Sequence, residues 1–109
     1  MTVETANQMK EAFSTADTWV QIREIADQII KETGASDPFW EEEEKRLLIG
    51  AMAYVKFELK EDEMKKVLEE ITNGADKAGG PAYSTMPEMT RKSVQAGVLV
   101  RMQPFMVNE

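Results

Sequence analysis

The feature that most constrains the fold is the placement of the four prolines, at positions 38, 81, 87 and 104. A proline inside a helix removes a hydrogen bond and clashes with the preceding turn, so long helices must lie between these positions. Between the prolines, apolar residues recur at three- and four-residue spacing, and no convincing run of alternating β-branched residues occurs. With 109 residues, the chain has the length of one domain. We therefore predict a single all-α domain over residues 1–109, a compact bundle of about five helices.

The apolar spacing places these helices at about residues 3–13, 17–33, 37–59, 61–73 and 87–103. The third helix has the strongest start signal, because Asp37 is a typical N-cap and Pro38 suits the first helical position. Gly34 and Gly74 suit positions just after a helix end. The apolar stripes predict that Val3, Trp19, Leu59 and Met89 face the core together with the rest of their helices.

Residues 74–86 contain three glycines and a proline and are expected to form a flexible connector. This segment separates parts of opposite charge. Residues 1–76 hold 18 acidic and 9 basic residues, a net charge of −9, whereas residues 77–109 hold 2 acidic and 4 basic residues, a net charge of +2. The net charge of −7 for the whole chain argues against an autonomous nucleic-acid-binding protein, which usually carries a basic surplus.

The composition excludes several kinds of chemistry. The chain has no cysteine and no histidine, so disulfides, thiolate nucleophiles and the commonest metal ligand and general base are absent. No calcium loop, phosphate-binding loop or carboxylate pair is marked by a motif. We expect no enzymatic activity, no cofactor and no metal. The longest nearly uncharged apolar run, residues 47–55, is far shorter than the ~20 residues of a membrane span, and residues 1–4 do not begin a signal peptide. We therefore expect a cytoplasmic protein or a cytoplasmic part of a membrane-associated one, without direct membrane contact of its own.

The start of the third helix carries the densest charge and two aromatic residues. The run Glu41–Glu44 is read either as a solvated first turn that suits the helix dipole or as a surface for a basic partner. The adjacent rings of Phe39 and Trp40 cannot share one helical face. Either both rings belong to the core, or one is presented to a partner as an anchor, and we expect Trp40 to be the more exposed of the two. A second acidic run, residues 61–63, opens the fourth helix.

Two blocks of this sequence resemble the type IV coupling proteins of bacterial conjugation and type IV secretion. The first block combines the segment Ile25–Ile30, the tetrapeptide Asp37-Pro38-Phe39-Trp40 and the segment Leu47–Val55. The second block comprises Pro87, Thr90, Ser93, Val94, Leu99, Pro104 and Phe105. The order and spacing of these pieces, with the Asp-Pro-Phe-Trp sequence at their centre, carry the resemblance over roughly residues 16–105, and residues 1–15 match least.

The resemblance implies the all-α domain of such an ATPase, which is inserted in a RecA-like nucleotide-binding domain. In that family the domain lies at the cytoplasmic mouth of a hexameric motor. It is implicated in docking the relaxase, its accessory proteins and the attached single-stranded DNA. The family's catalytic motifs do not occur in this sequence, so the resemblance implies an excised, monomeric domain without ATPase activity of its own.

Three functional hypotheses follow. The first is a substrate-recognition domain that docks a relaxase or accessory protein, with Glu41, Glu42, Glu43 and Glu61 as charged rim and Trp40 as anchor. The second is direct binding of single-stranded DNA, with Arg91, Lys92 and Arg101 on phosphates and Tyr83 stacking on a base. The third is a small acidic protein-interaction module that is unrelated to conjugation.

Overall fold

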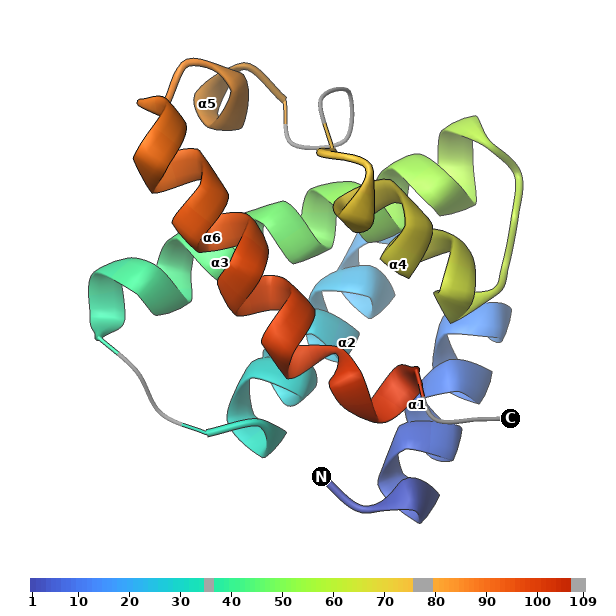
Figure 1. The fold of residues 1–109 in the computed structure, drawn as a ribbon. Coiled ribbons are helices and arrows are strands. Elements are labelled where there is room, and N and C mark those ends of the chain that lie inside the picture. The colour runs from blue at the N-terminus through green and yellow to red at the C-terminus, as the bar shows by residue number, and fades with distance from the viewer. Residues whose placement is uncertain (35–36, 76–79, 107–109) are drawn as a thin grey trace.

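The computed structural model describes residues 1–34, 37–75 and 80–106, and it confirms an all-α bundle (Figure 1). The helices are α1 (Val3–Thr15), α2 (Trp19–Glu32), α3 (Pro38–Ala53), the π-helix η1 (Tyr54–Glu58), α4 (Met64–Thr72), the short α5 (Gly80–Ser84), α6 (Glu88–Arg101) and the 3₁₀-helix η2 (Gln103–Phe105). Over the described part of the chain, no helix has both the length and the apolar character needed to span a membrane.

Local sequence signals begin and end these helices. At α2, the Thr18 hydroxyl accepts a hydrogen bond from the Gln21 amide and the Gln21 side chain accepts one from the Thr18 amide, a complete capping box. At α3, the Asp37 carboxylate accepts a hydrogen bond of 2.9 Å from the Phe39 amide, and Pro38 is the first helical residue, as predicted. Gly34, which follows α2, has a φ of +103° that other residues rarely adopt.

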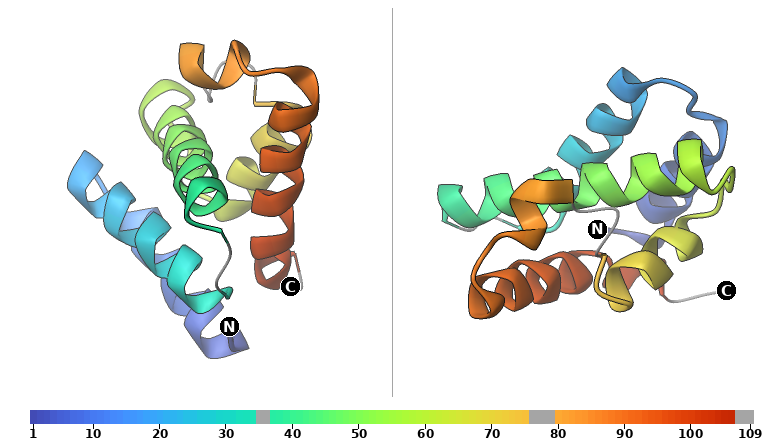
Figure 2. Two further views of the ribbon diagram at one scale, coloured as in Figure 1. Left: turned by 90° about the vertical axis from the view of Figure 1, so that its left-hand side faces the viewer. Right: turned by 90° about the horizontal axis from the view of Figure 1, so that it is seen from above.

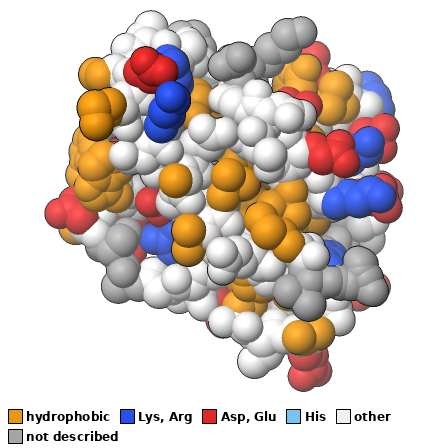
Figure 3. Space-filling view, viewed as in Figure 1, with side chains coloured by type: hydrophobic (Ala, Val, Ile, Leu, Met, Phe, Trp, Pro, Cys, Tyr) orange, Lys and Arg blue, Asp and Glu red, His pale blue; other side chains and the backbone are white. Residues whose placement is uncertain are grey.

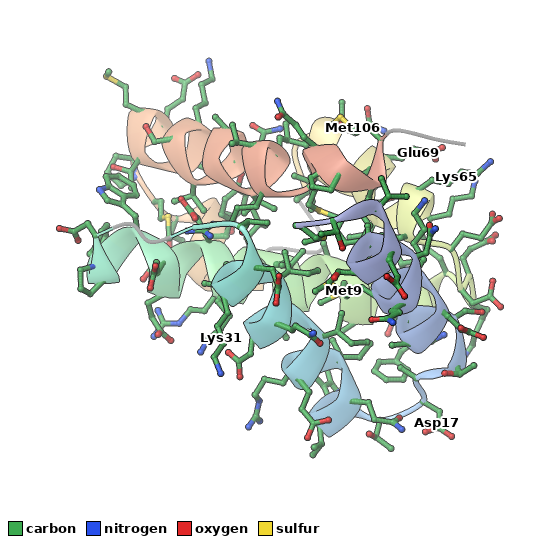
Figure 4. All side chains as sticks on the ribbon, turned by 90° about the horizontal axis from the view of Figure 1, so that it is seen from below. Met9, Asp17, Lys31, Lys65, Glu69 and Met106 are labelled. Carbon is green, nitrogen blue, oxygen red and sulfur yellow. The ribbon has the colours of Figure 1, made fainter. Side chains whose placement is uncertain are left out.

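The helices form three layers with α3 in the middle (Figure 2). The pair α1 and α2 covers one side of α3, and α4 and α6 cover the other side. At one end α1 also reaches α4 and η2, which closes the bundle. A single core runs through the layers, and Met9 points into it between the helices (Figure 4). Its largest fully buried side chains are Phe13, Ile22, Ile29, Leu47, Leu48, Met52, Ile71 and Met102.

The π-helix changes the predicted end of the third helix. An α-helix over residues 37–59 would turn Leu59 toward the core, one turn after the buried Val55. In the structure the Leu59 amide donates to the Tyr54 carbonyl, five residues back, so the last turn is wider than an α-helical turn. Leu59 therefore leaves the apolar face and is exposed. The prediction for this residue was wrong because sequence periodicity assumes a constant pitch.

Three other apolar residues predicted to face the core are also exposed. Val3, Trp19 and Met89 lie in the first turns of α1, α2 and α6, and Met89 is 83% exposed. Val3 and Trp19 lie close to the apolar stripes of their helices but in the first turn, and Trp19 stays exposed although its ring meets Phe57 of η1. Met89 lies five residues before Val94, about 140° around the helix, and so on a different face of α6 from the buried Val94 and Val98. The periodicity of a helix identifies its inner face and does not tell where the covering helix ends.

The predicted connector 74–86 is only partly a connector. Helix α5 lies within it, and Tyr83 on α5 is buried in the core cluster. Residues 76–79 lie outside the described residues. The glycine and proline content suggested a plain linker, but the buried Tyr83 side chain and its hydrogen bond to the Arg91 carbonyl attach the short helix to the bundle.

Candidate functional site

A buried ion pair links the middle layer to α6. The Arg101 Nε atom lies 2.6 Å from Glu44 Oε1, and the two side chains are only 6% and 9% exposed. The Arg101 Nη1 atom also donates to the end of α2, at 3.1 Å from the Ile30 carbonyl, 2.9 Å from Thr33 Oγ1 and 3.0 Å from the Gly34 carbonyl. A buried charge needs such complete pairing because removing it from water costs on the order of several kcal/mol. The pair thus joins α2, α3 and α6 at one point.

Gly97 makes room for this pair. It lies on α6, one turn before Arg101, and a Cβ atom at this position would collide with Oε2 of Glu44. The close approach of the Glu44 carboxylate to α6 therefore requires glycine at position 97. Gly97 was predicted to lie on the inner face of its helix, but its neighbour is a carboxylate instead of an apolar side chain.

Two sequence expectations change with this pair. The DNA-binding hypothesis placed Arg101 on phosphates, but Arg101 is buried and its guanidinium is held by Glu44 and by the end of α2. The run Glu41–Glu44 was treated as one set, but Glu44 turns inward while Glu42 is exposed. The sequence does indicate that Glu44 is buried, because it lies one turn before Leu47 and Leu48 and thus in register with the buried face of α3.

The first turn of α3 presents the two aromatic residues of the Asp-Pro-Phe-Trp sequence. Their ring centroids lie 5.1 Å apart in an edge-to-face arrangement. Phe39 is 54% exposed, whereas Trp40 is half-buried and packs against the core. The prediction of Trp40 as the more exposed ring was wrong. The reason is helical register. Trp40 lies one turn before the buried Glu44 and so on the inner side of α3, whereas Phe39 lies one position earlier and so points to a different side of the helix.

Three glutamates follow these rings. Glu42 is exposed and Glu41 is partly buried, whereas the Glu43 side chain is only 12% exposed. Arg46, one turn later, approaches two of them, with Nη1 at 3.1 Å from Glu43 Oε2 and Nε at 4.0 Å from Glu42 Oε2. We call the set Phe39, Trp40, Glu41, Glu42 and Glu43 the α3 N-terminal surface.

A hollow of about 290 Å³ adjoins the α3 N-terminal surface, between α2 and α3. Its lining residues are Asp27, Ile30, Lys31, Pro38, Glu41, Glu42 and Lys45. Lys45 crosses from α3 to pair with Asp27 of α2 at 3.1 Å, and Lys31 points away from the bundle (Figure 4). On the neighbouring face, hydrophobic side chains gather over the first turns of α3 and α6 (Figure 3). The surface thus combines apolar rings, carboxylates and a depression.

Glu61 does not belong to this surface. It lies in the loop after η1, whereas Glu41, Glu42 and Glu43 lie at the start of α3 (Figure 1). The 16 residues of α3 alone separate the two places by about 24 Å at 1.5 Å per residue. The four glutamates proposed as one charged rim are therefore divided between two ends of the middle layer.

The residues of the DNA-binding hypothesis are not brought together as a set. Tyr83 is buried, and its hydroxyl donates to the Arg91 carbonyl at 3.3 Å. The Arg91 Nη1 atom donates to the Ser84 carbonyl at 3.3 Å, so Arg91 ties α6 to α5. Lys92 is exposed and pairs with Glu88 at 3.1 Å. This hydrogen bond and charge lower the pKa of the Glu88 carboxyl. Arg101 lies about 15 Å further along α6 and is buried, as described above.

Within residues 1–34, 37–75 and 80–106, no group of three or more acidic side chains is arranged to hold a metal ion. Comparison of the chain with protein-family models, curated proteins and solved structures gave no match. The fold therefore defines an all-α helical bundle with an aromatic and acidic surface. None of these comparisons identifies a coupling-protein domain, so that family stays a hypothesis from the sequence resemblance.

Proposed function

We propose that this chain is a non-catalytic protein-docking domain whose α3 N-terminal surface binds a basic segment of a partner protein. The observation that carries the proposal is the exposed Phe39 ring, set edge-on against Trp40 and followed directly by three glutamates. Aromatic side chains with an apolar body are frequent anchors of protein interfaces, and a charged rim selects the partner.

The surface is held in place before any partner arrives. The Asp37 cap and Pro38 define the first turn of α3. The Lys45–Asp27 pair attaches the next turn to α2, and the Glu44–Arg101 pair attaches it to α6. A surface that is already ordered loses less conformational entropy on binding, which favours affinity. This rigidity supports a docking role for a turn that otherwise has no structural need for an exposed aromatic ring.

The charge of the surface indicates the chemistry of the partner. The first two turns of α3 contribute three glutamates to this surface, because Glu44 is buried against Arg101. The basic residues of these turns are Lys45, which pairs with Asp27 of α2, and Arg46. Acidic rims accelerate the encounter with a basic partner and make binding weaken as salt increases. A relaxase or a relaxosome accessory protein, which handles DNA, offers basic segments of this kind. The chemistry of the surface therefore agrees with the docking function that the coupling-protein resemblance implies.

The proposal is tested by binding to purified relaxase and accessory proteins of conjugative elements, immobilised on a sensor surface. The variant Glu41→Gln/Glu42→Gln/Glu43→Gln removes the charge and keeps the size of the side chains, and Phe39→Ala removes the outer ring. We expect each to weaken binding by about tenfold, as truncation of an interface anchor does. The matched control is Glu4→Gln/Glu11→Gln/Glu24→Gln on exposed positions of α1 and α2.

Equal affinity for the wild-type chain and both surface variants would contradict the proposal. Binding of single-stranded DNA that is lost in Arg91→Ala/Lys92→Ala and not in the α3 variants would favour the DNA-binding alternative instead.

A further inference from the structure

A second exposed aromatic pair lies at the other end of the middle layer. The ring centroids of Trp19, at the start of α2, and Phe57, in η1, are 5.8 Å apart. Trp19 is 57% exposed and the adjacent Val20 is 59% exposed, whereas Phe57 is half-buried. Large apolar side chains in contact with each other on a surface mark interaction sites more often than single exposed residues do. We call Trp19, Val20 and Phe57 the α2–η1 surface.

The π-helix and its lysine fix this surface. Lys56 lies next to Phe57 in η1, and its Nζ atom donates to the Ser14 carbonyl at the end of α1 at 2.8 Å. The same Nζ atom lies 4.9 Å from the centroid of the buried Phe13 ring. Just after η1, Lys60 has a φ of 58°, a left-handed conformation that is costly for a residue other than glycine. Wide turns and strained residues of this kind are frequent at functional sites.

An acidic loop and a hollow adjoin the aromatic pair. Residues 58–63 hold four acidic residues and one lysine, a net charge of −3, and all of them are exposed. The hollow has a volume of about 520 Å³ and is lined by Ser14, Ala16, Asp17, Lys56, Phe57, Lys60, Glu61 and Asp62. Asp17 lies at the connection between α1 and α2 and points outward (Figure 4). A neighbouring hollow of about 280 Å³ shares Ser14 and Asp62 with it.

We propose that the α2–η1 surface is a second docking site, which takes a lysine- or arginine-rich segment carrying a large apolar side chain. The apolar side chain packs on Trp19 and Phe57, and its cationic neighbours face Glu58, Glu61 and Asp62. Five acids surround the site, Asp17, Glu58, Glu61, Asp62 and Glu63, and they outnumber the four lysines that line the two hollows, Lys10, Lys56, Lys60 and Lys65. The inference does not depend on the α3 N-terminal surface, and it makes the chain bivalent.

Charge decides between a basic partner and a second copy of the chain. Each copy carries a net charge of −7, so two copies that meet at an acidic loop repel each other. A basic segment gains from the same charges. The occupant that fits the surface is therefore a foreign cationic and apolar segment.

The two tryptophans of the chain allow each surface to be observed separately, because one lies in each surface. In Trp40→Phe, all tryptophan fluorescence comes from Trp19. The probe is a synthetic amphipathic peptide of lysine and leucine, and its matched control is the same peptide with every leucine replaced by serine. We expect the first peptide to shift the Trp19 emission to shorter wavelength with saturation, and the serine peptide to bind at least about tenfold more weakly.

The acidic loop is tested in the same Trp40→Phe background. Glu61→Lys/Asp62→Lys should weaken binding of the lysine–leucine peptide by about tenfold. The control Glu4→Lys/Glu11→Lys makes the same change in net charge on α1 and should leave the affinity within about twofold. Circular dichroism of each variant verifies that the helical fold is kept.

Three results would overturn the inference. The serine peptide could bind as tightly as the leucine peptide, both charge reversals could weaken binding equally, or the Trp19 emission could stay unchanged while the complex forms. A dimer in sedimentation experiments that Val20→Lys disperses would assign the surface to a second copy and would also overturn the inference.

The variant Trp19→Phe leaves only Trp40, whose fluorescence reports the α3 N-terminal surface. Failure of one proposal is therefore distinguished from failure of the other.

Discussion

Glu44 and Arg101 determine how α2, α3 and α6 meet, since the guanidinium on α6 contacts Glu44 of α3 and the carbonyls at the end of α2. Replacing Glu44 by Leu leaves a buried cation without its carboxylate, and we expect this to lower the free energy of unfolding by about 3–5 kcal/mol. The double replacement Glu44→Leu/Arg101→Met removes both charges and should recover a large part of that loss. Urea denaturation of the two single variants and the double variant measures the coupling. Additive losses would contradict the account.

Gly97 gives a second prediction in which two effects have opposite signs. By helix propensity alone, Gly97→Ala should stabilise α6 by up to about 1 kcal/mol. In this structure the added Cβ meets Oε2 of Glu44, whose carboxylate is held by Arg101. We expect a net destabilisation of about 1–3 kcal/mol, measured by thermal unfolding. Ser93→Ala, on the exposed side of the same helix, should be neutral or slightly stabilising, and an equal gain in both variants would contradict the collision.

The sequence could predict part of this residue-level picture. The Asp37 cap, the Pro38 start and the buried positions Met64, Val67, Leu68 and Ile71 follow from local patterns, and the structure confirms them. The partner of Glu44 could not be predicted, because Arg101 is 57 residues away. No local rule selects one arginine among the basic residues. The same limit applies to Arg101, Tyr83 and Trp40, whose exposure depends on the helices that cover them.

Among the elements, the π-helix is the one that periodicity could not anticipate. It ends at Glu58, and two residues later Lys60 adopts a φ of 58°. Lys60→Gly removes the Cβ that disfavours this conformation and should raise the free energy of unfolding by up to about 1 kcal/mol. Lys65→Gly, at an exposed position inside α4, should lower it by about 1 kcal/mol. Destabilisation by both glycines in chemical denaturation would show that the strain is absent.

The first turn of α6 offers a pH-dependent test. Lys92 holds the pKa of the Glu88 carboxyl below its usual range through a hydrogen bond and its charge. A lowered pKa in the folded state means that the pair stabilises the protein above the unfolded-state pKa of Glu88. This contribution is lost as the pH falls through the folded-state pKa. In Lys92→Met, nuclear magnetic resonance titration should give a higher pKa for Glu88, and an unchanged value would contradict the pairing.

The helix boundaries illustrate what local sequence can determine. All five predicted helices exist, and their starts differ from prediction by at most three residues. Helix starts have side-chain caps and prolines that can be read directly, as at Thr18 and Asp37. Helix ends depend more on packing, and the change from α3 to η1 is the clearest example. Helix α5 was missed because five residues are too few for a periodic pattern.

The whole molecule is a helical bundle with an aromatic and acidic surface at each end of its middle layer. Both surfaces present carboxylates at their rims, so both interactions should depend on salt. We expect the affinity for a basic partner to fall several-fold when ionic strength rises from 0.05 M to about 0.2 M, as the Debye length shortens. Unfolding in urea should hardly respond to the same change because the Glu44–Arg101 pair is buried. Titration calorimetry and denaturation at the two ionic strengths make this comparison.

The central claim is that the start of α3 receives a basic protein partner. The most direct measurement is a titration of the isotopically labelled chain with a relaxase or accessory protein, followed by amide chemical shifts in nuclear magnetic resonance. We expect the amide chemical shifts of residues 37–46 to change. Those of residues 17–20 and 57–63 should change as well if the second surface is also occupied. Perturbations confined to the exposed side of α6, with the start of α3 unchanged, would contradict the central claim.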